Sequence, residues 1–246
     1  MNYQNTIASP VSISGKGLHT GQQVTVTLEP APADSGIQFM RTDIPGCPVV
    51  KAIPENVFDT SRGTAIKDGK AEVYTIEHLM AALSGLSLDN ILVKMMGPET
   101  PILDGSSRVY IELIKEVGIK KLNVPRHFAT VKEEITFSIP EQQVELTIKP
   151  ADHFKMTVNV DYETKVLSKQ QAVLNNLEDF YPDVYNCRTF VFLNELQFLI
   201  QNNLIRGGDL DNAIVFVDEI PEKAVLKQLA EFFNKKDITV TPDHVL

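Results

Sequence analysis

The sequence is poor in residues that mark several classes of protein. It has two cysteines and no tryptophan in 246 residues. Two cysteines cannot build the disulfide framework of a small secreted domain. No apolar run approaches the length that crosses a bilayer, and the first residues lack the basic and apolar stretches of a signal peptide. These shortages predict a soluble protein of the cytoplasm without a transmembrane segment.

Positive charge is also scarce. Lysine and arginine number 23 against 32 aspartate and glutamate, which gives a net charge of −9. Binding of nucleic acid depends on clustered cations that neutralise phosphates. The charge balance therefore argues against a nucleic-acid partner, and so against an RNA-binding scaffold of the ribosomal type. The hydrophobic content of 43% is that of a globular protein, long enough for one large domain or two of ordinary size.

Two stretches of the chain repeat each other. QQVTVTLEPA at 22–31 and QQVELTIKPA at 142–151 share six of ten residues, and both alternate apolar and polar positions as half-buried strands do. Coincidence between two strands is the simple alternative, but the similar order of elements in the two halves favours duplication. We predict an α+β protein with mainly antiparallel sheets in two similar domains, 1–124 and 125–246, with Pro125 at the boundary.

Periodicity and turn residues place further elements. The first half has a hairpin over 65–73, with Asp68-Gly69 in its turn, and helices over 75–85 and 107–117. In the second half the patterns predict strands within 130–162 and at 185–193, 212–219 and 237–241, a helix from 194 to 207, and a helix over 221–236. Cys187 is expected to be a buried residue of its strand.

The helix TIEHLMAALSG at 75–85 carries the first chemical candidate. Its apolar stripe consists of Ile76, Leu79, Met80 and Leu83. Thr75 is the expected N-cap and Gly85 the end. Glu77 and His78 then lie at the positive end of the helix dipole, which favours an ionised carboxylate and a neutral imidazole able to bind a metal. A solvated helix start is the simpler interpretation, and one histidine is less than a zinc site requires.

Four other motifs each have a structural and a functional interpretation. GKGLHTG at 15–21 places His19 between glycines, as a turn or as a close backbone approach to a ligand. PILDGSS at 101–107 contains Asp104 in a turn before a helix. In CRTFVF at 187–192, Thr189 suits a strand, or its hydroxyl could donate to an oxyanion. RGGDLDNAIVF at 206–216 contains Gly208, which could simply end a helix.

The joint order of the motifs is more specific than any one of them. GLHTG, VYTIEHLMAAL, SLDNI, PILDGS, RTF and GGDLDNAIV run along the whole chain. In this order they resemble the UDP-3-O-acyl-N-acetylglucosamine deacetylases, zinc hydrolases of lipid A biosynthesis. The resemblance implies two domains with their helices packed between two sheets, and removal of acetate from the 2-amino group of UDP-3-O-(3-hydroxyacyl)-N-acetylglucosamine. It also implies that His78 is a zinc ligand, Glu77 the general base on metal-bound water, and Thr189 the hydroxyl that stabilises the oxyanion.

The resemblance extends to the substrate. It implies an apolar passage for the fatty chain, built from a strand-helix-strand insert in the second half, and it implies that Phe190, Gly208 and His19 bind substrate. Asp209 departs from the small hydroxyl residue that follows the two glycines in many relatives. Some relatives continue into a fused 3-hydroxyacyl-carrier-protein dehydratase, which is a further candidate partner.

One departure concerns the metal. The family completes its Zn²⁺ site with a later His-Lys-x-x-Asp segment, and this sequence contains no such segment. Only one of three expected ligands, His78, is therefore present, and we expect the chain to be an N-terminal portion of the enzyme that is inactive by itself. The alternative is a non-catalytic module that binds a sugar nucleotide or acyl group and has lost the metal.

Overall fold

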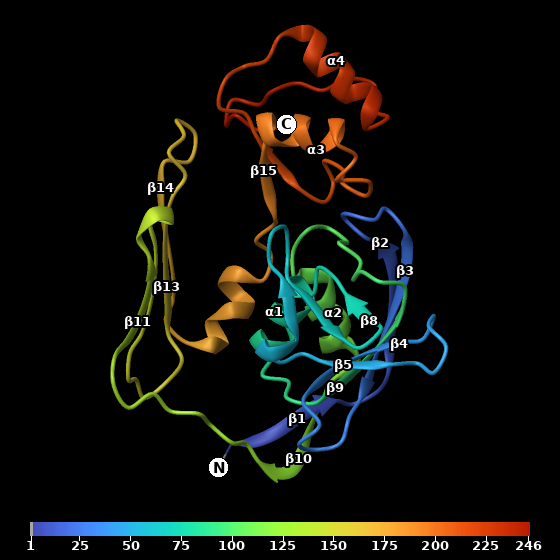
Figure 1. The fold of residues 1–246 in the computed structure, drawn as a ribbon, viewed down its shortest axis with the longest axis vertical. Helices are drawn as coiled ribbons and strands as arrows, with labels where there is room; N and C mark the ends of the chain where they lie inside the picture. Colours follow the sequence, from blue (N-terminus) through green and yellow to red (C-terminus); the bar gives the residue numbers. More distant parts are fainter. Residues whose placement is uncertain (1) are drawn as a thin grey trace.

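A five-stranded sheet organises the first half of the protein. The structure, a computed structural model, describes residues 2–246 and has an α+β fold (Figure 1). The strand order is β2-β3-β9-β4-β5, with β2 (Val11–Lys16), β3 (Gln23–Pro30), β9 (Ile91–Met96), β4 (Ile37–Arg41) and β5 (Val49–Lys51). Because β9 runs antiparallel to β3 and parallel to β4, it joins two hairpins into one sheet.

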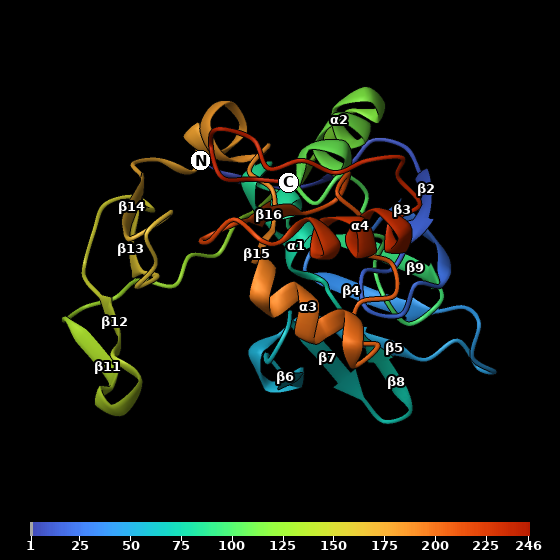
Figure 2. The ribbon, with the colours of Figure 1, turned by 90° about the horizontal axis from the view of Figure 1, so that it is seen from above.

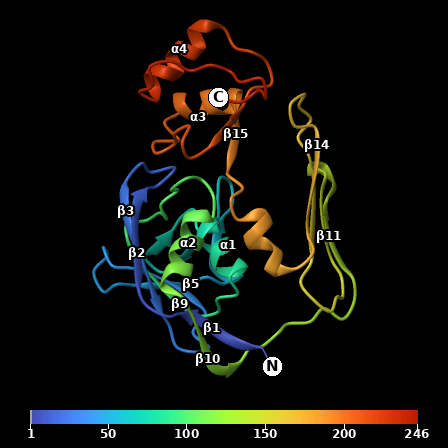
Figure 3. The same ribbon diagram turned by 180° about the vertical axis from the view of Figure 1, so that it is seen from behind.

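Two helices pack on one face of this sheet. They are α1 (Glu77–Gly85) and α2 (Arg108–Val117), and Figure 3 shows both inside the curve of the sheet. The apolar stripe predicted for the first helix is confirmed, because Ile76, Leu79 and Leu83 are buried in the core. The second helix ends at Gly118, whose φ of +82° suits glycine. The Tyr110 hydroxyl donates to the Pro101 carbonyl at 2.7 Å, so this buried ring is also anchored by its polar end.

Smaller sheets surround the first core. A three-stranded sheet contains β6 (Val57–Asp59), β7 (Ala65–Asp68) and β8 (Ala71–Val73), which confirms the hairpin predicted over 65–73. Strand β1 (Tyr3–Ile7) pairs antiparallel with β10 (Ile119–Pro125). The division into 1–124 and 125–246 stays a proposal. Short helical turns lie at Pro54–Asn56, Pro140–Gln142, Leu177–Asp179 and Phe180–Val184.

The second half begins with two separate hairpins. One pairs β11 (Ile135–Ile139) with β12 (Val144–Ile148), and the other pairs β13 (Met156–Asp161) with β14 (Lys169–Leu174). Within residues 2–246, each hairpin is a sheet of its own, and both stand away from the five-stranded sheet in Figures 1 and 2. The two copies of the repeat, β3 and β12, are each the second strand of an antiparallel hairpin.

The last part of the chain is a strand-helix-strand unit followed by a helix. Strand β15 (Phe190–Phe192) leads into α3 (Leu193–Gln201) and pairs in parallel with β16 (Ile214–Phe216), and α4 (Lys223–Phe232) follows. These elements enclose a second core, which includes Val191, Leu196, Val215, Val217 and Leu229.

Three expectations for this part are wrong in detail. The helix predicted to reach 207 ends at Gln201, because Asn203 takes a left-handed φ of +56° that stops it. Residues 237–241 form no strand, since the free edge of β16 is taken by a bridge to Val245. Cys187 is exposed rather than buried, because β15 starts three residues later; Cys47 is exposed too, and both thiols are free.

In the described residues 2–246, no helix has both the length and the apolar character needed to cross a membrane. The cytoplasmic location stays a prediction.

Candidate functional site

The start of α1 differs from the expected N-cap. Thr75 has a φ of +58°, and its hydroxyl donates to Glu99 Oε1 at 2.9 Å instead of capping the helix. The N-cap position is Ile76, and no side chain of residues 2–246 makes a capping hydrogen bond there. Thr75 is therefore wrong as a cap because a buried carboxylate on another segment has taken its hydroxyl.

Glu77 and His78 occupy the first turn of α1 and are half-buried. Glu77 Oε2 accepts a hydrogen bond from the Thr64 amide at 2.9 Å. A Cβ atom added to Gly63 would lie 2.9 Å from Glu77 Oε1, so a glycine lets the 63–64 segment run this close to the carboxylate. The Glu77 carboxylate is thus held by the backbone.

The environment of His78 favours its neutral form. Burial lowers the pKa of the imidazole, and this outweighs the negative charges of Glu77 and Asp104, which raise it. The sequence predicted a neutral imidazole from the helix dipole, whereas burial is the largest cause in the structure. A neutral ring nitrogen is what a metal ion requires of histidine.

Thr189 is brought to the turn that contains Asp104. The Thr189 amide donates to the Gly105 carbonyl at 2.7 Å, and Arg188 Nε donates to the Asp104 carbonyl at 2.8 Å. Gly105 has a φ of +81°, and a side chain there would overlap the backbone of Asn212. The 104–105 turn therefore connects Thr189 of the second half with the residues around His78.

Two opposing effects act on the pKa of Asp104. Burial disfavours its charged form, but hydrogen bonds from Ser106 and Arg108 outweigh burial and hold the pKa of the carboxyl below its ordinary value. Asp104 is therefore negatively charged at neutral pH and contributes a fixed charge near His78.

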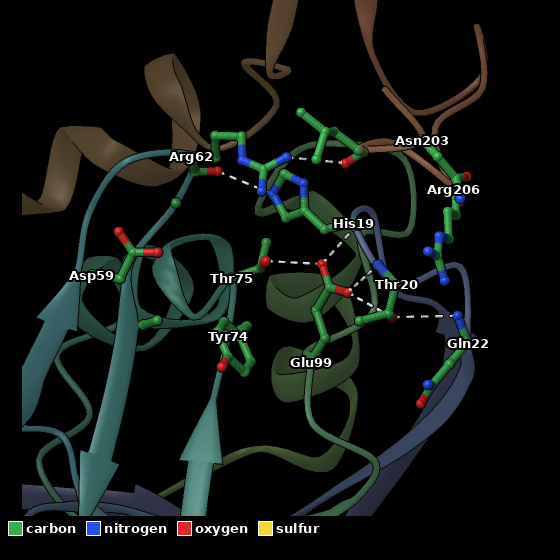
Figure 4. A pocket seen from close by; sticks show the side chains of 13 residues that line it. His19, Thr20, Gln22, Asp59, Arg62, Tyr74, Thr75, Glu99, Asn203 and Arg206 are labelled. Atoms are coloured by element: carbon green, nitrogen blue, oxygen red, sulfur yellow. Dashed lines mark hydrogen bonds between the residues drawn. The ribbon is translucent and has the colours of Figure 1, made fainter. Parts of the chain in front are cut away.

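His19 lies on the other side of the 62–64 segment. Its amide donates to Glu99 Oε1 at 3.0 Å, and its ring Nε2 lies 3.0 Å from the Arg62 carbonyl oxygen (Figure 4). A carbonyl only accepts, so Nε2 carries a proton, and in a neutral ring Nδ1 is then the acceptor. Nδ1 is buried and has no partner within residues 2–246.

A cavity of about 300 Å³ lies beside His19 (Figure 4). Its lining includes His19, Thr20, Arg62, Gly63, Glu99 and Arg206. Gly63 belongs to this lining and also lies against Glu77, so the cavity adjoins the Glu77 carboxylate through one segment of backbone. Sequence reasoning missed Arg62 and Glu99, because neither stands in a pattern that marks it as buried or functional.

The remaining sequence candidates have strong packing roles. The Phe190 ring lies 5.4 Å from the ring of Tyr162 and 5.5 Å from that of Phe216, centroid to centroid. A Cβ atom at Gly208 would lie 2.5 Å from the Ile205 side chain. The preceding Gly207 amide donates to the Leu18 carbonyl at 3.0 Å, which places the two glycines against the His19 loop. A contact of Phe190, Gly208 or His19 with substrate stays a proposal.

The residues present do not complete a metal site. Within the described part of the chain, no group of three or more histidine, cysteine, aspartate or glutamate residues has a metal-binding arrangement. Zinc in proteins takes three or four protein ligands. His78 fits as one ligand, and the described residues offer no complete ligand set around it.

Comparison with known proteins identifies the family. Residues 4–238 match the UDP-3-O-acyl N-acetylglycosamine deacetylases. The chain belongs to this family. The resemblance found in the ordered motifs is thereby confirmed, and the α+β fold agrees with it.

Two kinds of relative are similar to the chain. The bifunctional enzyme LpxC/FabZ of Porphyromonas gingivalis is 45% identical over 89% of this chain and 47% of its own length. The bifunctional enzyme of Chlorobaculum tepidum is 40% identical over 93% of this chain and 49% of its own. The UDP-3-O-acyl-N-acetylglucosamine deacetylase of Bdellovibrio bacteriovorus is 38% identical over 100% of this chain and 81% of its own. The chain thus spans about half the length of the bifunctional relatives.

Proposed function

We propose that this protein removes the acetyl group from the 2-amino group of UDP-3-O-(3-hydroxyacyl)-N-acetylglucosamine, a step of lipid A biosynthesis. Membership of the deacetylase family supports the substrate class. The Glu77–His78 pair at the start of α1 supports the reaction most directly. The Thr64 amide holds the Glu77 carboxylate, and His78 is half-buried near Asp104.

The side chains suit the hydrolysis of an amide. Such a reaction needs a base that takes a proton from the attacking water and a donor that stabilises the developing oxyanion. Glu77 is the base in this proposal, since its carboxylate is half-buried and keeps one oxygen free of the Thr64 amide. Thr189 is the donor, with its backbone anchored to Gly105 at 2.7 Å so that its hydroxyl is carried by a fixed segment.

Zinc enters the proposal as a cofactor with an incomplete ligand set. His78 would contribute one ring nitrogen, and a bound Zn²⁺ would supply a Lewis acid for the carbonyl of the substrate. Because the described residues offer no complete site, we assign no step of the reaction to the metal.

Substrate contacts and a fused partner complete the proposal. His19 offers a buried acceptor at Nδ1, which suits a hydroxyl group of the substrate. Phe190 and Gly208 belong to the strand-helix-strand unit, whose apolar side chains suit a fatty chain. The names of three relatives describe bifunctional enzymes, in keeping with a fused dehydratase, which stays a prediction for this protein.

The test measures the release of acetate from the substrate by the whole protein product of the gene. Loss of a general base costs about 10²- to 10⁴-fold in kcat, so Glu77→Gln should lose that much with little change in KM. The matched control is Glu112→Gln, an exposed glutamate on α2, which should keep the wild-type rate. A Glu77→Gln variant as active as wild type would refute the role of Glu77.

A further inference from the structure

Glu99 is a buried carboxylate in a segment where the sequence gives no sign of one. It lies between Pro98 and Pro101 and is 0% exposed. Its Oε1 accepts from the His19 amide at 3.0 Å and the Thr75 hydroxyl at 2.9 Å. Its Oε2 accepts from the Thr20 amide at 3.0 Å and the Thr20 hydroxyl at 2.7 Å. Four donors fill the acceptor capacity of an ionised carboxylate.

One of these donors belongs to a strained residue. Thr75 has a φ of +58°, which is unfavourable for a β-branched side chain and persists only where the surroundings impose it. Its hydroxyl is held by Glu99, and its carbonyl accepts a hydrogen bond from the buried Thr100 hydroxyl. Glu77 follows two residues later, so the direction in which α1 leaves Thr75 determines where the Glu77–His78 pair points.

The other donors belong to the loop that carries His19. The Glu99 carboxylate lies so close to Gly17 that a Cβ atom at that position would overlap it. The same loop accepts a hydrogen bond from Gly207 at the Leu18 carbonyl, 3.0 Å away. Figure 4 shows Glu99 between Thr75 on one side and His19 and Thr20 on the other. A single carboxylate therefore ties the start of α1 to the His19 loop.

We propose that Glu99 is a positioning residue for the Glu77–His78 pair. It holds Thr75 in the left-handed conformation and fixes the His19 loop, and so it sets the geometry of the site. Glu99 does not act on substrate directly, because all of its acceptor capacity is used by the protein. Its effect on catalysis rests on the proposed function, whereas its effect on the geometry does not.

The chemistry of Glu99→Gln makes it a sharp probe. The amide side chain has the same size but replaces one acceptor oxygen by an NH₂ donor. Whichever way the amide is turned, this donor faces the backbone amide of His19 or Thr20, which can only donate. At least one anchor of the loop is then lost. At Thr75 the matched pair is Thr75→Val, which loses the hydroxyl, and Thr75→Ser, which keeps it.

The experiment measures kcat and KM of these variants in the polypeptide as the gene encodes it. Misplacement of catalytic groups by about 1 Å costs up to about 10²-fold, so Glu99→Gln and Thr75→Val should lose about 10- to 100-fold in kcat with KM within about twofold of wild type. Thr75→Ser should keep the wild-type kcat.

The control is Asp89→Asn. Asp89 also joins separate segments, since it accepts from the Asn5 amide at 2.7 Å and from Arg126 at 2.7 Å, but within residues 2–246 it has no hydrogen bond to Glu77, His78 or His19. This variant should lose stability and keep kcat. An equal loss of kcat in Asp89→Asn, or a wild-type kcat in Glu99→Gln, would overturn the positioning role.

Amide hydrogen exchange gives a second reading that does not depend on activity. Glu99→Gln should speed exchange at His19 and Thr20, and also at Thr64, whose amide bonds Glu77 and reports the position of that carboxylate. Unchanged exchange at Thr64 would overturn the proposal, because Glu99 would then hold only the loop. If the wild-type protein released no acetate, the proposed function would fail while the exchange at Thr64 still decided the role of Glu99.

Discussion

The two copies of the repeat, β3 and β12, differ in how far their apolar side chains are buried. Val24, Val26 and Leu28 of β3 are 1%, 0% and 2% exposed. Their equivalents on β12, Val144, Leu146 and Ile148, are 45%, 58% and 46% exposed. The same alternation of residues therefore produces a buried face in the first half and an open one in the second.

The difference lies in the partners of each hairpin. In the first half β9 fills the space between β3 and β4, and α1 and α2 cover the sheet. In the second half, β12 and β13 each keep a free edge within the described residues. Alternation decides which side of a strand is apolar, whereas burial requires a neighbouring strand and a covering layer.

The largest expected effect comes from the same substitution in both halves. Leu28→Ala should lower the free energy of unfolding by about 2–5 kcal/mol, because it empties a space in a closed core. Leu146→Ala should cost less than about 1 kcal/mol, because its side chain is mostly in contact with water. Urea unfolding followed by circular dichroism measures both. Equal losses of free energy of unfolding in the two variants would show that β12 is covered in solution. The two copies of the repeat would then not differ in burial.

The junction of the two halves gives the next largest effect. Gly105→Ala should lower stability by more than about 1 kcal/mol, because the new methyl group strains the positive φ and overlaps the Asn212 backbone. Gly69→Ala is the control, since Gly69 has a φ of +55° with open space around it. It should show only the cost of the backbone conformation. Thermal unfolding of both variants measures the difference, and a smaller loss for Gly105→Ala would mean that the halves do not dock here.

A hydrogen bond between two side chains of the first half should make the free energy of unfolding depend on pH. The Tyr74 hydroxyl donates to Glu72 at 2.6 Å, and this hydrogen bond together with burial raises the pKa of Tyr74 to about 12. Because the folded-state pKa is raised, the contribution to stability is complete below the unfolded value of 10.0 and is lost as the pH rises towards 12. The stability difference between wild type and Tyr74→Phe should shrink between these values in urea unfolding. A difference that stays constant would contradict the assignment.

The smallest effect on stability is expected on the open face. Phe137 on β11 is 58% exposed and lies opposite Leu146 in the register. Phe137→Ser should change the free energy of unfolding by about 1 kcal/mol or less. It should also reduce self-association, because exposed apolar patches promote contacts between molecules. Sedimentation velocity over a range of concentrations measures this. Identical association of wild type and Phe137→Ser would show that this face does not mediate self-association.

Periodicity was sufficient where structure depends on neighbours in the sequence. The stripe on α1, the hairpin turn at Asp68-Gly69 and the end of α2 at Gly118 all follow from local rules. The neutral state of His78 was predicted from the helix dipole, whereas its largest cause is burial by the tertiary structure. The Glu77–His78 pair was found because both residues sit on one helix turn.

Contacts between residues far apart in the sequence could not be predicted. Thr75 looks like an N-cap until Glu99, 24 residues away, takes its hydroxyl. Glu99 looks like part of an exposed turn until donors 80 and 79 residues away, at His19 and Thr20, enclose it. Cys187 was expected to be buried, but only the tertiary structure shows where β15 begins.

Binding of the substrate and release of acetate, measured together, decide whether the protein is a deacetylase. The polypeptide as the gene encodes it is mixed with UDP-3-O-(3-hydroxyacyl)-N-acetylglucosamine, and both bound ligand and released acetate are quantified. We expect one acetate for each free amine formed, at a rate that falls in Glu77→Gln. Saturable binding without any release of acetate would contradict it and favour a non-catalytic sugar-nucleotide or acyl-binding module.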